Sequence, residues 1–388
     1  MRYKEFRLVE SKVQLNEEGP RIDHAEDIVF WEGSKGAVRA LDSLFELEKG
    51  GHEQVTIKWD GSPAIIFGRD ENGDFLLTDK SGFSASGYDG KAKSADDLEA
   101  MLMNRKGASN PDEAKRNNYL QFVGNMKDIF DEYERAVPKD LLGFFKGDLL
   151  YYNTPSVNEN GDYEFTPNIV TYEVSQDSDL GQQIGKSKTG VVVHRYMDPV
   201  SGTETAVDPS IINQFQGDEV LVVPPVTAQQ PAQIDDENIN SLKAVVAQNA
   251  QAIDALLDKA KLTELKMSDF SKILYTYVNQ NGTNPNLGGN FEDWVATSKL
   301  SESKKKRIIE WTRSNAKGFD ALWQVVRGIQ EVKNNIINQF DSHEAPVRSS
   351  INGQSGGEGY VLDHPEGSIK LVNRGEGGFT QANRAVQR

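Results

Sequence analysis

The chain has 388 residues, of which 37 % are hydrophobic and 26 % are charged, and its formal net charge is −16. This length and composition are those of a globular protein with one large domain or two to three ordinary ones. The absence of Cys excludes disulfides, thiolate metal sites and Cys nucleophiles, and the acidic balance argues against a protein that coats nucleic acid over its whole surface.

No apolar run approaches the roughly 20 residues that cross a bilayer. The N-terminal stretch "MRYKEFRLVESKVQ" also lacks the apolar core of a signal peptide. These features predict a cytoplasmic protein with no membrane partner.

The first 80 residues predict a helix followed by strands. Residues 21–34 are dense in His and acidic residues and are interpreted as a loop, because they lack paired His at metal-ligand spacing. Apolar residues then recur at three-to-four spacing over 34–48, which predicts an amphipathic helix. The segments 53–59, 64–70 and 74–80 are rich in β-branched and aromatic residues, and "ENG" at 71–73 supplies a hairpin turn between the last two.

A second group of elements follows up to residue 226. Residues 95–135 predict helix, interrupted by the loop "GASNPD". Four further strands are predicted at 143–153, 168–174, 190–197 and 218–226. Together these elements predict an α+β domain of antiparallel character.

The composition then changes at a linker. Residues 224–237 are rich in Pro, Gln and Ala, and the period from 238 to 340 becomes helical. Strand-like sequence returns in "GYVLDH" and "SIKLVN". We therefore predict three segments: the first part of an α+β domain at 1–230, an all-helical insertion at 231–345, and the last strands and basic tail of the first domain at 346–388.

Five short stretches carry chemistry-bearing residues in a distinctive order. They are "KWDGS" with Lys58, "FKGDLLYY" with Asp148, "GVVVH" ending at His194, "GEGYVLDH" with Glu358, and "SIKLVNR" with Lys370. Each stretch by itself is a weak signal, but residue type, order and strand context agree across the set.

This order resembles the covalent nucleotidyltransferases, which comprise ATP-dependent DNA ligases, RNA ligases and mRNA capping enzymes. The resemblance implies an antiparallel, ATP-grasp-like ligase adenylation fold with an all-α insertion. It also implies ATP and Mg²⁺ or Mn²⁺ as cofactors, and a lysine that accepts AMP. A free lysine has a pKa of about 10.4, so such a site needs nearby cations that favour the neutral amine.

The resemblance assigns a role to each residue of the set. Lys58 is the AMP-accepting nucleophile, Glu358 the carboxylate that works with the metal, and Lys370 the contact to the α-phosphate. The nucleotide-binding positions are Asp60, Gly61, Lys80, Asp148 and His194, where Asp60 and Gly61 form the turn behind the nucleophile.

The chain departs from the family pattern at the last motif. A second lysine is usual two positions after the one that matches Lys370, whereas residue 372 is Val, and Arg374 is the candidate substitute. Only 18 residues follow Lys370, so no OB-fold domain fits there. Both this and the helical insertion favour the bacteriophage-type RNA ligases over DNA ligases and capping enzymes.

The resulting functional prediction is an ATP-dependent RNA ligase. Its partners would be RNA or other polynucleotide ends with a 5′-phosphate and a 3′-hydroxyl. The helical insertion would hold them, and the basic stretch 303–313 is the candidate contact. The alternatives are a nick-sealing DNA ligase, AMP transfer to a protein or small molecule, and a non-catalytic nucleotide-binding or interaction module. The missing second lysine supports the last of these.

Overall fold

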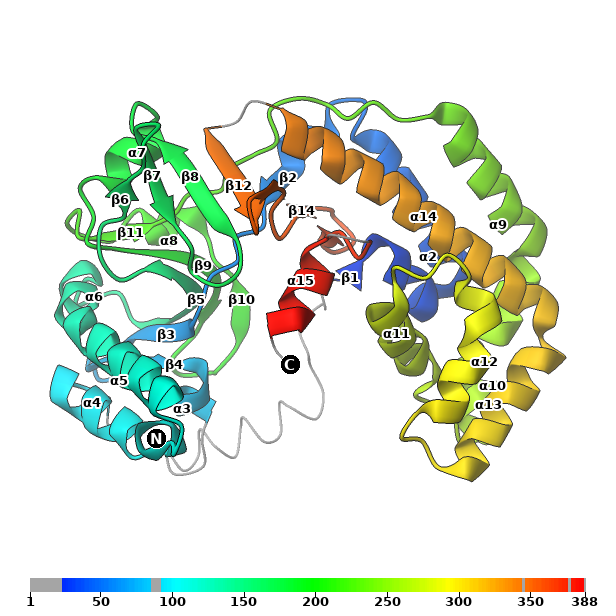
Figure 1. The fold of residues 1–388 in the computed structure, drawn as a ribbon, viewed down its shortest axis with the longest axis horizontal. Helices are drawn as coiled ribbons and strands as arrows, with labels where there is room; N and C mark the ends of the chain where they lie inside the picture. Colours follow the sequence, from blue (N-terminus) through cyan, green and yellow to red (C-terminus); the bar gives the residue numbers. More distant parts are fainter. Residues whose placement is uncertain (1–22, 85–91, 344–345, 376–377, 387–388) are drawn as a thin grey trace. The chain divides into compact units, whose positions relative to one another are not determined.

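The structure is a computed structural model that describes residues 23–84, 92–343, 346–375 and 378–386 (Figure 1). Helices and strands come in separate runs along the chain, and most neighbouring strands pair antiparallel, so the α+β class is confirmed. The described chain forms two compact units. We call Trp59–Pro224 with Pro346–Asn352 the sheet unit, and Arg21–Lys58, Pro225–Ala345 and Gly353–Arg388 the helical unit.

The sheet unit is built on a six-stranded sheet. Its strand order is β10-β9-β5-β3-β4, with β11 parallel to β9 and every other pair antiparallel. The strands are β3 (Ala64–Arg69), β4 (Phe75–Asp79), β5 (Gly143–Tyr151), β9 (Thr189–Met197), β10 (Glu204–Ala206) and β11 (Val220–Val222). The predicted hairpin is confirmed: β3 pairs with β4, and the amide of Asp70 donates to the carbonyl of Asp74 across the turn, at 3.0 Å.

Helices cover one face of this sheet and complete its apolar core. Apolar residues of α4 (Ala95–Met103), α5 (Glu113–Asp128) and α6 (Phe130–Ala136) pack with those of β3, β4 and β5. Leu98, Met126 and Tyr133 are fully buried there. The remaining short helices are α3 (Lys80–Ser84), η3 (Lys106–Ser109), α7 (Asp179–Ile184) and α8 (Pro209–Ile212).

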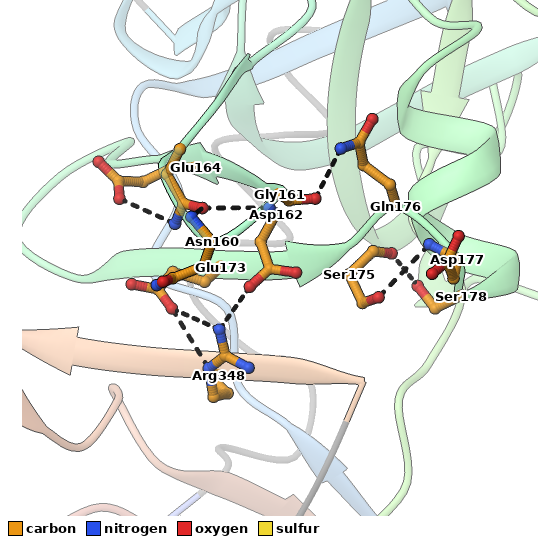
Figure 2. A network of polar contacts seen from close by, with 11 residues as sticks. Asn160, Gly161, Asp162, Glu164, Glu173, Ser175, Gln176, Asp177, Ser178 and Arg348 are labelled. Atoms are coloured by element: carbon orange, nitrogen blue, oxygen red, sulfur yellow. Dashed lines mark hydrogen bonds and ion pairs between the residues drawn. The ribbon is translucent and has the colours of Figure 1, made fainter.

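A second, antiparallel sheet in the same unit receives a strand from far along the chain. Within the sheet unit its strand order is β12-β8-β7-β6, which joins β6 (Ser156–Val157), β7 (Asp162–Phe165) and β8 (Thr171–Ser175) to β12 (Val347–Ile351). Figure 2 shows Arg348 of β12 reaching Asp162 and Glu173, at 2.5 and 2.8 Å. Because Arg348 is largely exposed, this ion pair orients β12 more than it stabilises it.

The helical unit combines one set of packed helices with a four-stranded sheet. Its longest helix, α14 (Ala316–Ser342), buries an apolar stripe that includes Phe319, Val326 and Ile336, as the helical period predicts. The other helical elements are η1 (Ala25–Asp27), α2 (Ile28–Glu46), η2 (Gly51–Gln54), α9 (Asp236–Leu256), α10 (Lys259–Glu264), α11 (Phe270–Asn281), α12 (Leu287–Thr297), α13 (Glu302–Ser314) and α15 (Phe379–Val386).

The sheet of this unit brings distant strands together in the order β1-β15-β14-β2. These strands are β1 (Asp23–His24), β2 (Val55–Ile57), β14 (Tyr360–Leu362) and β15 (Ile369–Leu371), and β13 (Gln354–Ser355) precedes β14. Only β1 and β15 run parallel. One face of the sheet is apolar and joins the helical core through Val55, Tyr360, Leu362, Ile369 and Leu371.

Two sequence-based expectations differ from this arrangement. The expectation of a loop at 21–34 is wrong for the described residues of that segment, where β1, η1 and the start of α2 lie. Ile28, Val29 and Phe30 are buried against the helices, and the local sequence does not reveal this packing. The helices of 231–345 also do not pack by themselves: they share one core with α2 and the four-stranded sheet.

Candidate functional site

The position of Lys58 follows from the register of the four-stranded sheet. Ile57 lies opposite Tyr360, and the amide of Lys58, one residue further, donates to the carbonyl of Gly359 at 2.9 Å. Lys58 thus extends β2 alongside the residue that precedes β14. Because side chains alternate along a strand, Lys58 and Thr56 project from the face opposite to Val55 and Ile57.

The same alternation places Lys370 and His24 on the face that carries Lys58. Lys370 lies opposite Val361, which lies opposite Thr56, and His24 pairs with Lys370 from the other side. Residues directly opposite each other in neighbouring strands share a face. Three groups from positions 24, 58 and 370 therefore lie on the polar face of one sheet, behind which lies the apolar core.

Gly359 brings Glu358 to this face. Its φ is +128°, a conformation that favours glycine, and a Cβ there would lie 2.2 Å from the carbonyl oxygen of Leu371. The chain can thus turn just before β14, and the carboxylate of Glu358 forms an ion pair with the amine of Lys58. Both side chains are largely enclosed, at 23 % exposure for Lys58 and 14 % for Glu358.

A cavity of about 260 Å³ opens at these side chains, and all of its walls belong to the helical unit. It is lined by three cationic side chains, one carboxylate, and mostly polar neighbours: Lys58, Lys370, Arg384, Glu358, His24, Asn279, Val372, Phe379, Thr380 and Asn383. The described lining thus carries a formal excess of positive charge in a protein whose net charge is −16. Such a cavity favours an anionic ligand.

His24 is held neutral next to these cations. Burial lowers its pKa well below the ordinary value, and the positive charges of Arg374, Lys333, Lys370 and Lys58 lower it further. Its Nδ1 is buried without a hydrogen-bond partner among the described residues. The ring therefore adds a neutral polar group to the cavity wall.

Arg374, the candidate substitute for a second lysine, forms buried ion pairs instead of lining the Lys58 cavity. Its guanidinium donates to both oxygens of Asp27, at 2.7 and 2.6 Å, and to Glu26 at 3.0 Å. Lys333 of α14 donates to the two oxygens of Glu26, at 2.7 and 2.9 Å. All four side chains are buried, and their charges balance. Burial opposes the charge of Arg374, but Asp27 and Glu26 outweigh this effect and raise its pKa.

The position at which the covalent nucleotidyltransferases have their second lysine is therefore occupied by an uncharged residue in this chain, Val372. Val372 lines the cavity but is 4 % exposed and carries no charge. The further cation on the cavity wall is Arg384 of α15. Arg384, His24 and the buried cluster of Arg374 with Glu26, Asp27 and Lys333 were not predicted, because their only visible signals in the sequence are the His- and acid-rich segment 21–34 and the basic tail.

The remaining predicted site residues belong to the sheet unit, where three of them lie together. The Oδ2 of Asp148 on β5 is 3.0 Å from the Nε2 of His194 on β9. Gly61 packs on the backbone of Asp148 so closely that a Cβ would lie 2.7 Å from the Cβ of Asp148. His194 and Asp148 are part-exposed, so this pair is accessible to a ligand.

Asp60 and Lys80 are placed differently from that trio. Asp60 is 6 % exposed, and its carboxylate accepts hydrogen bonds from the side chain of Asn168 and from the amides of Ile169 and Val170, at 2.9, 3.0 and 3.2 Å. These hydrogen bonds fix residues 168–170 to the turn that contains Asp60 and Gly61. Lys80 is an exposed residue at the start of α3.

The described residues contain no group of three or more His, Cys, Asp or Glu side chains arranged to hold a metal ion. Mg²⁺ is commonly bound by only one or two carboxylates, with water and substrate phosphates completing its shell. Glu358, the carboxylate on the Lys58 cavity, fits that mode. In the part of the chain that the structure covers, no helix has the length and apolar character needed to cross a bilayer.

Comparisons with known proteins give one match. A search of curated proteins found no match, and neither did a search of solved structures. A family model described as "Family of unknown function (DUF6267)" matches residues 20–93 and 108–388. Because this match spans most of the chain, the protein belongs to the DUF6267 family.

Proposed function

We propose that the protein is an ATP-dependent RNA ligase that works through a lysyl-AMP intermediate on Lys58. The observation that carries the proposal is the ion pair between Lys58 and Glu358, with Lys370 on the same face of the sheet. These residues match the pattern of the covalent nucleotidyltransferases in type and order, although about 300 positions separate Lys58 from the other two. Their meeting on one cavity supports a common chemical role.

In the first step, the unprotonated amine of Lys58 attacks the α-phosphorus of ATP. A nitrogen–phosphorus bond forms, the bond from the α-phosphorus to the bridging oxygen breaks, and pyrophosphate leaves with that oxygen. Glu358 orients the amine before attack, and Lys370 offsets the negative charge on the α-phosphate. A Mg²⁺ held by Glu358 and the phosphates would supply further positive charge.

The later steps transfer AMP from Lys58 to the polynucleotide and then release it. The α-phosphorus of lysyl-AMP is attacked by the 5′-phosphate of a polynucleotide, and the nitrogen–phosphorus bond breaks. A 3′-hydroxyl then attacks the activated 5′-phosphate, and AMP leaves. For an adenylation domain of the nucleotidyltransferase type, the sequence resemblance assigns nucleoside contacts to Gly61, Asp148 and His194, a phosphate contact to Lys80, and the turn behind the nucleophile to Asp60.

The decisive experiment measures covalent labelling. The protein is incubated with α-labelled ATP or GTP and Mg²⁺ or Mn²⁺, denatured, and tested for retained label. We expect label with ATP. In Lys58→Arg it should fall to background, because a guanidinium keeps the ion pair to Glu358 but is always protonated and cannot attack. Lys317→Arg, at an exposed lysine of α14, is the matched control and should label normally.

Absence of label with both nucleotides would overturn the ligase proposal. It would favour a non-catalytic nucleotide-binding module, the second candidate, which the buried Val372 supports. If label forms, joining of 5′-phosphorylated RNA is compared with joining of nicked DNA under the same conditions. Faster joining of the DNA would contradict the assignment to RNA.

A further inference from the structure

A second cavity adjoins the Lys58 cavity in the helical unit. Its volume is about 310 Å³, and it lies between the end of α11, the turn that follows it, and α15. Asn279, Thr380 and Arg384 line both cavities. The two cavities therefore share part of their walls, and Arg384 borders both of them.

The lining of the second cavity is suited to phosphate. Besides the three shared residues, it presents the uncharged polar side chains of Gln280, Thr283 and Gln381. Its described lining contains no carboxylate. Arg374 borders only this second cavity, and its guanidinium bonds Asp27 and Glu26, whereas Arg384 is a cation that lines both cavities.

Arg384 is held on a helix whose start is fixed to the sheet. Gly378 lies against the backbone of Asn373, two residues beyond β15, so closely that a Cβ would lie 2.6 Å from its carbonyl oxygen. Phe379, the first residue of α15, is 6 % exposed. The amide of Thr380 donates to the carbonyl of Asn373 at 3.4 Å. These contacts connect the position of Arg384 to that of Lys370 on β15.

We propose that the second cavity binds the β- and γ-phosphates of ATP and the pyrophosphate that they become, with Arg384 as the main ionic contact. This inference rests on the proposed function for its chemistry. The leaving group is one oxygen bridge away from the phosphorus that Lys58 attacks, so its site must adjoin the Lys58 cavity. Pyrophosphate leaves with several negative charges, which a guanidinium and neutral donors stabilise without a competing carboxylate.

The first test measures binding without turnover. Magnesium pyrophosphate is titrated calorimetrically into the full-length wild-type protein, Lys58→Arg, Arg384→Ala and Arg384→Lys. We expect Arg384→Ala to weaken binding by roughly 10- to 100-fold, the loss of a charge-assisted contact, with partial recovery in Arg384→Lys. Lys58→Arg should bind nearly as well as wild type. Arg327→Ala removes an equal charge from α14 and should leave binding unchanged.

The second test separates a role toward pyrophosphate from a structural role. Arg384→Ala should lower kcat/KM for adenylation by ATP, and also the rate at which added pyrophosphate removes the label from adenylated protein as ATP. Sealing of a pre-adenylated 5′ end, in which no pyrophosphate takes part, should fall by a much smaller factor than adenylation. Equal loss in both reactions would overturn the assignment, as would pyrophosphate binding that does not depend on Arg384.

The two proposals fail in different ways. If pyrophosphate binding depends on Arg384 but no lysyl-AMP forms, the phosphate site stands and the ligase proposal falls. If lysyl-AMP forms but Arg384→Ala binds pyrophosphate as wild type does, the ligase proposal stands and the phosphate site falls.

Discussion

Gly359 is the single residue on which the meeting of Lys58 and Glu358 depends most directly. It lies between Glu358 and β14, has a φ of +128°, and has no room for a Cβ, which would lie 2.2 Å from the carbonyl oxygen of Leu371. The "EG" pair of the sequence therefore has two physical functions. The glycine allows the turn, and the turn delivers the carboxylate.

We predict that Gly359→Ala destabilises the helical unit by about 1–3 kcal/mol and disrupts the ion pair of Lys58. The added methyl group must displace the backbone of β15. The urea midpoint and the covalent labelling should both fall. The control is Gly124→Ala in α5, where a Cβ meets no atom within 4 Å, so stability should stay equal or rise by up to about 1 kcal/mol. Equal behaviour of the two variants would contradict the prediction.

His24 makes the stability of the helical unit depend on pH. Because burial and nearby cations lower its pKa in the folded protein, protons bind more tightly to the unfolded chain. The stability that neutral His24 allows is fully present above the pKa of His in the unfolded chain, about 6.5, and is lost as the pH falls toward the lower pKa of His24 in the folded protein. We predict a decline in the free energy of unfolding of up to about 1.4 kcal/mol per pH unit below 6.5.

The measurement compares wild type with His24→Gln. Urea unfolding at pH 5, 6, 7 and 8 should show a shallower decline on the acid side for the variant, which lacks the titrating ring. Identical pH dependence of the two proteins would show that His24 does not carry this effect.

At the scale of elements, a buried quartet connects three segments that are distant in sequence. Glu26 and Asp27 come from η1, Lys333 from α14, and Arg374 from the chain after β15. Each charge has an opposite partner, so the quartet is neutral and hydrogen-bonded. Such pairs cost desolvation, but removal of one partner leaves a buried charge uncompensated.

We predict that Lys333→Met lowers the free energy of unfolding by about 3–5 kcal/mol. Glu26 would then keep only its contact with Arg374. The double variant Glu26→Gln with Lys333→Met should recover at least half of this loss, because it removes the unpaired carboxylate. Chemical denaturation of wild type, Lys333→Met, Glu26→Gln and the double variant gives the coupling energy. Losses that simply add would contradict a shared buried network.

At the scale of the whole molecule, neither unit is a continuous segment of chain. The helical unit takes residues from the beginning, middle and end, and its core joins α2, the long helices and the four-stranded sheet. Of the predicted site residues, Lys58, Glu358 and Lys370 belong to this unit, and the others belong to the sheet unit. The helices between 236 and 342 are therefore part of the support of the Lys58 cavity.

We predict that replacement of residues 236–342 by a short Gly/Ser linker unfolds the helical unit instead of leaving a working adenylation domain. The deletion exposes the apolar side of α2 and of the four-stranded sheet. Limited proteolysis should cleave the chain within 23–58 and after 353, and covalent labelling should be absent. A protease-resistant variant that still forms lysyl-AMP would show that these helices are dispensable.

The sequence by itself determined the local elements and the order of the chemical groups. The hairpin of β3 and β4 follows from "ENG", and the stripe of α14 follows from a period of 3.6 residues, because such patterns depend on neighbours a few positions apart. The order of Lys58, Glu358 and Lys370 was likewise readable without a structure.

Only the tertiary structure decided which of these groups meet. The pairing of β1 with β15 places His24 beside Lys370, the turn of α15 brings Arg384 to the same cavity, and burial with Asp27 removes Arg374 from it. Each outcome depends on contacts between segments separated by tens to hundreds of residues. Local sequence patterns carry no information on such contacts, since the packing of the shared apolar core and the neutralisation of buried charge select them.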